Sequence, residues 1–275
     1  PVPGRPMAQD THASGGHRGA DWFFSQRDML IEGGTVRWID ERRKNAPPLL
    51  LTDVRFAARN GVRSHQLALD ATPPEGWGQR FSLRGQFRQP VLSTRSGNWQ
   101  QWDGQIFADL PQIDVSRIGR YVALDEWRAR EGRGALRAWG DVKDGRLAGA
   151  TVDLGLDGVN ATLAPGLAPL VLRSVAGRVV YKDVDGVFEL STTGLSFETD
   201  DHLRWPDGNL SLRMEQARGA KAARGGVKAD KLGLRMLSQI ANRLPLGKTL
   251  HRELTARAPA GLVERIEGDW EGPVD

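Results

Sequence analysis

The sequence predicts a mainly β protein made of antiparallel strands, and three observations support this fold class. Apolar and polar residues alternate with a period of two along most of the chain, as in Leu67, Leu69 and Ala71 against Gln66 and Asp70. This period is typical of strands that have one dry face and one wet face. The strand-like segments are short and are separated by glycine- and proline-rich turns. The hydrophobic content of 39% is low for a compact globule and suits a thin, extended sheet.

Two stretches depart from this alternation and predict short helical insertions. In the first, Asp114 can cap a helix in which Val115, Ile118 and Val122 form one stripe. The second has leucines at helical spacing before Pro245 and again in KTLHRELTARA. We therefore divide the chain into a polar linker or loop (1–20), a sheet segment (21–111), a helical insertion (112–131), a sheet segment continuing the first (132–234), a second helical insertion (235–258) and a closing strand (259–275).

Within the second sheet segment, two dipeptides predict tight hairpins. Asp144-Gly145 and Asp185-Gly186 each lie between strand-like runs, and an Asp-Gly pair favours the type I′ turn that joins antiparallel neighbours. These turns indicate that consecutive strands pair with each other.

Composition excludes several classes of protein. The chain has no cysteine, so it has neither disulfides nor thiolate metal sites. It contains no run of 18 apolar residues that could cross a membrane, and no signal peptide. It begins without a methionine and stops just after a Gly-Pro pair, so we expect it to be a piece of a longer protein whose membrane anchor, if present, lies elsewhere. The net charge is +4, but the arginines are scattered singly on polar strand faces. This scatter argues against nucleic-acid binding and more weakly favours contact with anionic headgroups.

No pattern in the sequence predicts catalysis, a cofactor or a metal. Gly247-Lys248-Thr249 resembles part of a phosphate loop, but Asn242 stands where the first glycine of that motif belongs. Asp200, Asp201 and His202 are adjacent, so on an extended chain they would point to opposite faces, and a hairpin turn explains them better. No carboxylates are paired for acid–base chemistry, and no nucleophile elbow is present. We therefore expect no enzyme activity.

The nine tryptophans leave carbohydrate binding open as an alternative, because aromatic platforms on β surfaces often stack against sugars. Trp38, Trp102 and Trp205 follow strand alternation, which favours a place in a core or a groove. Trp77 and Trp99 lie near turns, where they can be partly exposed. A sugar site would also need coplanar exposed rings and a carboxylate pair.

Several blocks, taken in order, resemble the YhdP family of AsmA-like proteins of the Gram-negative envelope. The blocks are ADWFFSQRDMLIEGGTVRWIDERR, LTDVRFAARNGVRSHQLALDATPP, GRGALRAWGDVKDGRLAGATVDLGLDGVNATLAPGLAPLVL, STTGLSFET, ADKLGLRMLSQIANRLPLGKTL and PAGLVERIEGDWEGP. Each block alone is only strand and turn chemistry. Their order and spacing over nearly all of residues 21–273 make the resemblance specific.

The resemblance implies an elongated, curved antiparallel sheet that forms an apolar trough with short helical insertions. It implies a periplasmic segment of an inner-membrane-anchored protein that carries phospholipid between the inner and outer membranes, without enzyme activity, cofactor, metal or nucleic acid. The membrane would be reached through parts outside this segment, and the envelope protein partners are open. We expect apolar strand residues to share one concave side and line a lipid groove: Val36, Trp38, Val54, Phe56, Leu67, Leu69, Phe81, Leu83, Phe87, Trp102, Ile106, Leu154, Leu156, Val179, Leu190 and Phe197.

A second interpretation is a non-catalytic envelope scaffold or binding module whose sheet closes on its own core. The two differ in one geometric feature. A continuous open trough supports transport of acyl chains, whereas a sealed sandwich supports a scaffold.

Overall fold

The computed structural model describes residues 12–39, 48–91, 93, 95, 97–118, 128–217, 222–244, 246 and 248–272. Twelve strands account for most of this part of the chain. Their bounds are β1 (Asp28–Trp38), β2 (Leu49–Asn60), β3 (Ser64–Thr72), β4 (Phe81–Arg88), β5 (Asp103–Asp114), β6 (Arg128–Lys143), β7 (Arg146–Thr162), β8 (Leu170–Val184), β9 (Val187–Thr199), β10 (Arg204–Glu215), β11 (Arg224–Gly233) and β12 (Leu262–Glu271).

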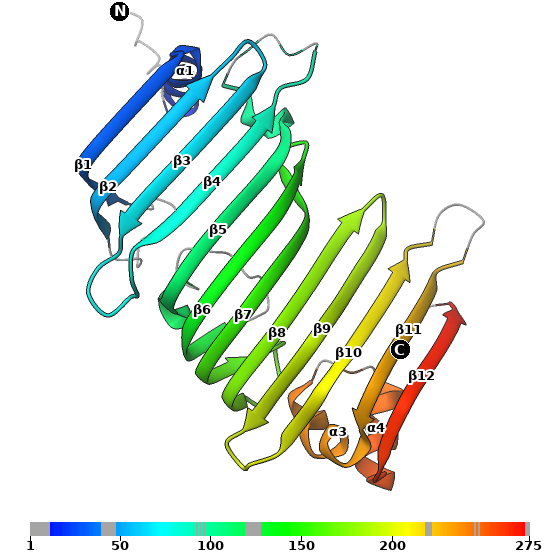
Figure 1. Cartoon of the computed structure of the whole chain (residues 1–275). Coiled ribbons are helices and arrows are strands. Elements are labelled where there is room, and N and C mark those ends of the chain that lie inside the picture. Colours follow the sequence, from blue (N-terminus) through cyan, green and yellow to red (C-terminus); the bar gives the residue numbers. More distant parts are fainter. Residues whose placement is uncertain are drawn as a thin grey trace, which may run out of the picture.

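All twelve strands belong to one open sheet, in which they follow one another in chain order. Every neighbouring pair is antiparallel, so the sheet is a meander with β1 at one edge and β12 at the other (Figure 1). Strands lie about 4.8 Å apart, so eleven spacings give a sheet roughly 50 Å wide across its strands. The predicted mainly β, elongated antiparallel fold is confirmed.

The two predicted Asp-Gly hairpins have the expected turn geometry. Asp144 and Gly145 have φ angles of 49° and 66° and join β6 to β7, and Asp185 and Gly186 have φ angles of 53° and 75° and join β8 to β9. Positive φ at both central residues is the signature of a type I′ turn, whose twist matches that of the paired strands.

Helices are few and lie at the ends of strands. They are α1 (His12–Ser25), α2 (Val115–Ile118), α3 (Leu234–Ile240), α4 (Lys248–Arg257) and two short 3₁₀ turns, η1 (Trp99–Gln101) and η2 (Ala241–Arg243). The second predicted insertion, 235–258, agrees closely with α3, η2 and α4. Figure 1 shows α1 near the ends of the first strands and α3 and α4 near the ends of the last strands.

Two predicted boundaries differ from the structure. The predicted linker 1–20 is helical from His12 onward, because the apolar end of α1 packs on the sheet; residues 1–11 lie outside the described residues. The predicted insertion 112–131 contains only the four-residue helix α2 among its described residues. Here β5 continues to Asp114 and β6 begins at Arg128, while Val122 lies among residues 119–127, outside the described part.

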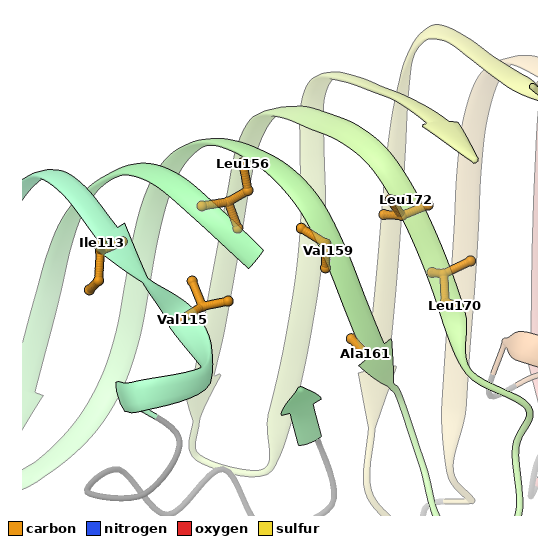
Figure 2. Close-up of a cluster of buried hydrophobic side chains, with 7 residues drawn as sticks. All are labelled: Ile113, Val115, Leu156, Val159, Ala161, Leu170 and Leu172. Carbon is orange, nitrogen blue, oxygen red and sulfur yellow. The ribbon is translucent and has the colours of Figure 1, made fainter. Parts of the chain in front are cut away.

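The sheet buries its apolar side chains in two separate clusters, both on the same face. One cluster contains Leu51, Val54 and Ala71 of β2 and β3. The larger cluster gathers side chains from β5, α2, β7 and β8, and Figure 2 shows the strands arching over it: Ile113, Val115, Leu156, Val159, Ala161, Leu170 and Leu172. The face that carries these clusters is therefore concave in this region.

Candidate functional site: an apolar trough along one face of the sheet

Directly paired residues of an antiparallel sheet lie on the same face, so the pairing register shows which side chains share a face. From β1 to β12 the register can be followed without interruption along two neighbouring rows, each with one residue from every strand. The first row is Met29, Ala58, Leu67, Gly85, Ile106, Gly140, Ala150, Tyr181, Leu190, Leu212, Val227 and Gly268. The second is Ile31, Phe56, Leu69, Leu83, Ala108, Ala138, Val152, Val179, Thr192, Leu210, Ala229 and Ile266.

Neither row contains a charged residue, and only Tyr181 and Thr192 bring polar side-chain atoms. The Thr192 hydroxyl accepts a hydrogen bond from the backbone N–H of Leu210 at 3.1 Å, beside a register shift between β9 and β10. The polar group of Thr192 therefore satisfies a backbone N–H group of the sheet. We call this apolar, concave face the trough.

The opposite face has the reverse character. On each strand, the residue next to the one in the first trough row points to the opposite face. These neighbours form a paired row that includes Asp28, Arg59, Gln66, Gln86, Gln105, Asp141, Lys182, Glu189 and Arg213. Ion pairs cross from strand to strand on this face, for example Arg84 with Asp70 at 2.8 Å and Arg178 with Asp153 at 2.5 Å. This outer face is adapted to water.

These outer pairs also shift the pKa values of their carboxyl groups. A hydrogen bond from the Arg178 guanidinium holds the pKa of Asp153 below its ordinary value, and hydrogen bonds from His202 and Arg204 do the same for Glu198. Since Asp153 and Arg178 are solvent-exposed, a pair of this kind contributes little to stability. The main effect of the outer pairs is to fix which face of the sheet meets water, because turning the charged face inward would remove these groups from water.

The register places the predicted groove-lining strand residues together on the trough. Leu67, Ile106 and Leu190 lie in the first row, and Phe56, Leu69, Leu83 and Val179 in the second. The others lie in flanking rows of the same face: Val36, Trp38, Val54, Phe81, Phe87, Leu154, Leu156 and Phe197. Trp102 immediately precedes β5 and is almost fully buried, where it stacks on His65 of the same face. Contact of these side chains with lipid remains a prediction.

Glycines along the trough are covered by large neighbours. A Cβ atom added to Gly104 would lie 2.6 Å from the ring of Phe87, its cross-strand partner, and one added to Gly225 would meet the ring of Trp270. A Cβ on Gly140 would meet the side chains of Ile106 and Leu147. Large side chains thus fill the space beside glycines of the neighbouring strands. Alternation by itself did not reveal this pairing, because it depends on register.

The aromatic rings described next do not form the exposed platform that a sugar site needs. Trp205 stacks on Phe197 within the trough at a centroid distance of 5.5 Å. Trp99 is exposed beside the β4–β5 connection, and Trp139 lies on the outer face against Phe107. Among the described residues no group of three or more histidines and carboxylates could hold a metal ion. Asp200 and Asp201 lie in the turn between β9 and β10.

The site is thus an open, one-sided antiparallel sheet whose apolar face is continuous from edge to edge, without a chemical centre among the described residues. The comparison with protein families is consistent with this class. The family model of the YhdP protein matches residues 6–274, so the chain belongs to the YhdP family. No curated protein and no solved structure matched the chain.

Membership of this family indicates a Gram-negative envelope protein of the lipid-transport type, a non-enzymatic kind, and the open sheet is compatible with that role. Within the part of the chain that the structure describes, no helix is long and apolar enough to cross a membrane.

Proposed function

We propose that this chain is a segment of a lipid conduit, in which phospholipid acyl chains lie in the trough and move across the strands from one edge of the sheet to the other. The observation that carries the proposal is the pair of uncharged rows that cross all twelve strands without a break. In the family's setting, this movement would take place in the periplasm between the inner and outer membranes.

Physical chemistry supports such a path. Burial of one methylene group is worth roughly 0.8 kcal/mol, so an acyl chain gains about as much in the trough as in a bilayer. A row of similar apolar positions has no deep trap, because each step exchanges one apolar neighbour for another. Exposed apolar side chains along the trough, such as Leu83 and Ile106, would otherwise face water at a cost.

The scaffold interpretation needs a sheet that seals its own core. In the described residues the sheet is open and β1 and β12 do not pair with each other, which supports the conduit over the scaffold. Carbohydrate binding has less support, since Trp205 is stacked inside the trough.

The proposal can be tested with a photoreactive side chain placed on each face of one strand. In β10, Leu212 faces the trough and the adjacent Ser211 faces outward. We expect the full-length protein with Leu212 replaced by p-benzoylphenylalanine to form phospholipid adducts in cells, detected by mass spectrometry, and the Ser211 replacement to form few. Equal adduct yields at the two positions would contradict the proposal.

A further inference from the structure

Helix α1 lies on the trough itself, over β2, β3 and the start of β5. Its Phe23 ring lies 5.9 Å from that of Phe56, and its Phe24 ring lies 5.2 Å from His65 and 4.6 Å from Trp102. Phe56 and His65 are inner-face residues by register. The apolar end of α1 therefore occupies surface that belongs to the trough.

Polar contacts tie the same end of α1 to the sheet. The buried Asn60 side chain donates from Nδ2 to the carbonyl of Gln26 at 2.7 Å and to that of Phe23 at 3.4 Å, so it satisfies carbonyls at the end of the helix. Asn60 Oδ1 is left to accept from Nδ1 of His65 at 2.9 Å. On the other side, Asp21 accepts a hydrogen bond from the backbone N–H of Gly97 at 2.9 Å.

An acyl chain and α1 cannot share this part of the trough. His65 is 1% exposed and Trp102 is 2% exposed, and their rings stack at 4.0 Å beneath Phe24. Farther along the sheet the trough carries side chains that reach solvent, for example Met214 at 36% and Ile266 at 42%. The covered part and the open part are continuous along the same two rows.

The helix depends on this docking for its stability. Its 14 residues include three glycines, and its first turn carries no acidic side chain. Isolated helices of this length are marginal in water, and interior glycines weaken them further. The buried Trp102 Nε1 and His65 Nε2 have no hydrogen-bond partner among the described residues, which weakens the docked state. Both features reduce the free energy that holds α1 on the sheet.

We propose that α1 is a lid that closes the trough over β2, β3 and Trp102, and that lipid enters this part of the trough only when α1 leaves it. This inference rests on the proposed conduit function. It assigns Phe23 and Phe24 the role of apolar side chains that stand where acyl chains would otherwise lie.

The test uses full-length protein with a photoreactive reporter at one of two trough positions, exposed to vesicles of phosphatidylethanolamine and phosphatidylglycerol. Leu69 is the cross-strand partner of Phe56, which the Phe23 ring contacts, and it reports the part of the trough next to α1; Leu212 reports the open part. Each is replaced by p-benzoylphenylalanine in turn. In the Phe23→Ala/Phe24→Ala variant we expect lipid adducts at position 69 to rise at least threefold and those at position 212 to stay unchanged. Trp22→Ala, on an exposed side chain of the same helix, is the control and should change neither.

Amide hydrogen exchange of residues 19–25 reports docking of α1 in the same samples. If amide exchange of residues 19–25 becomes fast in the double variant but lipid adducts at position 69 do not rise, the lid hypothesis is wrong. It is also wrong if the double variant leaves this exchange unchanged. If the double variant loses adducts at both positions because it misfolds, Asp21→Ala decides: a smaller rise at position 69 supports the lid, and no rise refutes it. No adducts at position 212 in the parent protein would refute the conduit itself.

Discussion

Between β2 and β8 the trough buries apolar side chains in two different ways in its two halves. Over part of β2 and β3 and over Trp102, a separate element, α1, covers the face through Phe23 and Phe24. Over β5–β8 the arching strands bury the face largely by themselves, with Val115 of the short helix α2 as the main added side chain (Figure 2). A cover supplied by a separate helix can be removed without unfolding the sheet, whereas burial by strand curvature cannot. We therefore expect the first half, and not the second, to open and close.

The largest expected effect tests whether both halves belong to one path. Leu83→Glu in the first half and Leu154→Glu in the second each place a charge on the trough, where an unpaired charge is costly to desolvate. Because one blocked layer interrupts a one-dimensional conduit, we expect each variant of the full-length protein to abolish rescue of envelope integrity at matched expression.

The matched control is Gln86→Glu, which adds the same charge to the outer face of the strand that carries Leu83. It should rescue nearly as well as the parent protein. Rescue by Leu83→Glu together with failure of Leu154→Glu would show that the two halves are not parts of one path.

The next effect concerns the self-buried half. Leu156 is 8% exposed within the larger cluster, and truncation of a buried leucine to alanine costs about 2–5 kcal/mol. We therefore expect Leu156→Ala to lower the melting temperature of the whole sheet. Leu147→Ala in the same strand removes a half-exposed side chain and should have a much smaller effect. A purely local loss of hydrogen-exchange protection in Leu156→Ala would contradict burial by the sheet as a unit.

A smaller effect is expected at Gly134, where β6 bends past β7. Its φ angle is 154°, and an added Cβ would lie 2.0 Å from the carbonyl oxygen of Gly155. Gly134→Ala should cost about 1–3 kcal/mol of unfolding free energy, because the backbone conformation disfavours a side chain. Gly155→Ala meets no atom within 4 Å and should be near neutral. Denaturant unfolding of both variants measures the difference, and equal stabilities would show that β6 does not need this glycine.

The smallest effect is a pH dependence confined to the half covered by α1. Burial lowers the pKa of His65 from its ordinary value of 6.5. The nearby Gln89 side chain acts in the opposite direction but does not cancel this effect. The folded state then binds fewer protons than the unfolded state, so docking is fully stabilised above pH 6.5 and weakens as the pH falls below it. Amide exchange of residues 19–25 should therefore accelerate, after correction for intrinsic rates, between pH 7.5 and 5.5, while β7 and β8 stay protected. A His65→Gln variant should lose this dependence.

Much of the fold could be predicted because it follows from local patterns. Alternation in β2–β4 indicated one-sided strands, and Asp144-Gly145 and Asp185-Gly186 indicated hairpins between neighbours, which together favour a meander. The helices were harder to predict. Residues 12–20 are rich in glycine and polar residues and were predicted to be a linker, because the described contacts that stabilise α1 are made at the other end of the helix. Likewise, β5 and β6 continue into the predicted insertion because each finds a paired strand.

By itself, the sequence determined which face of most strands is dry, since apolar and polar residues alternate with a period of two and a slip of one residue would turn the apolar side chains toward water. It also determined that there is no cysteine and no phosphate-loop motif to supply chemistry. Only the tertiary structure decided that the dry faces join into two unbroken rows, because register between strands depends on pairing partners far along the chain. It alone decided that α1 lies on the trough, since that placement arises from contacts among Phe24, His65 and Trp102, which are far apart in sequence and meet only when the sheet is complete.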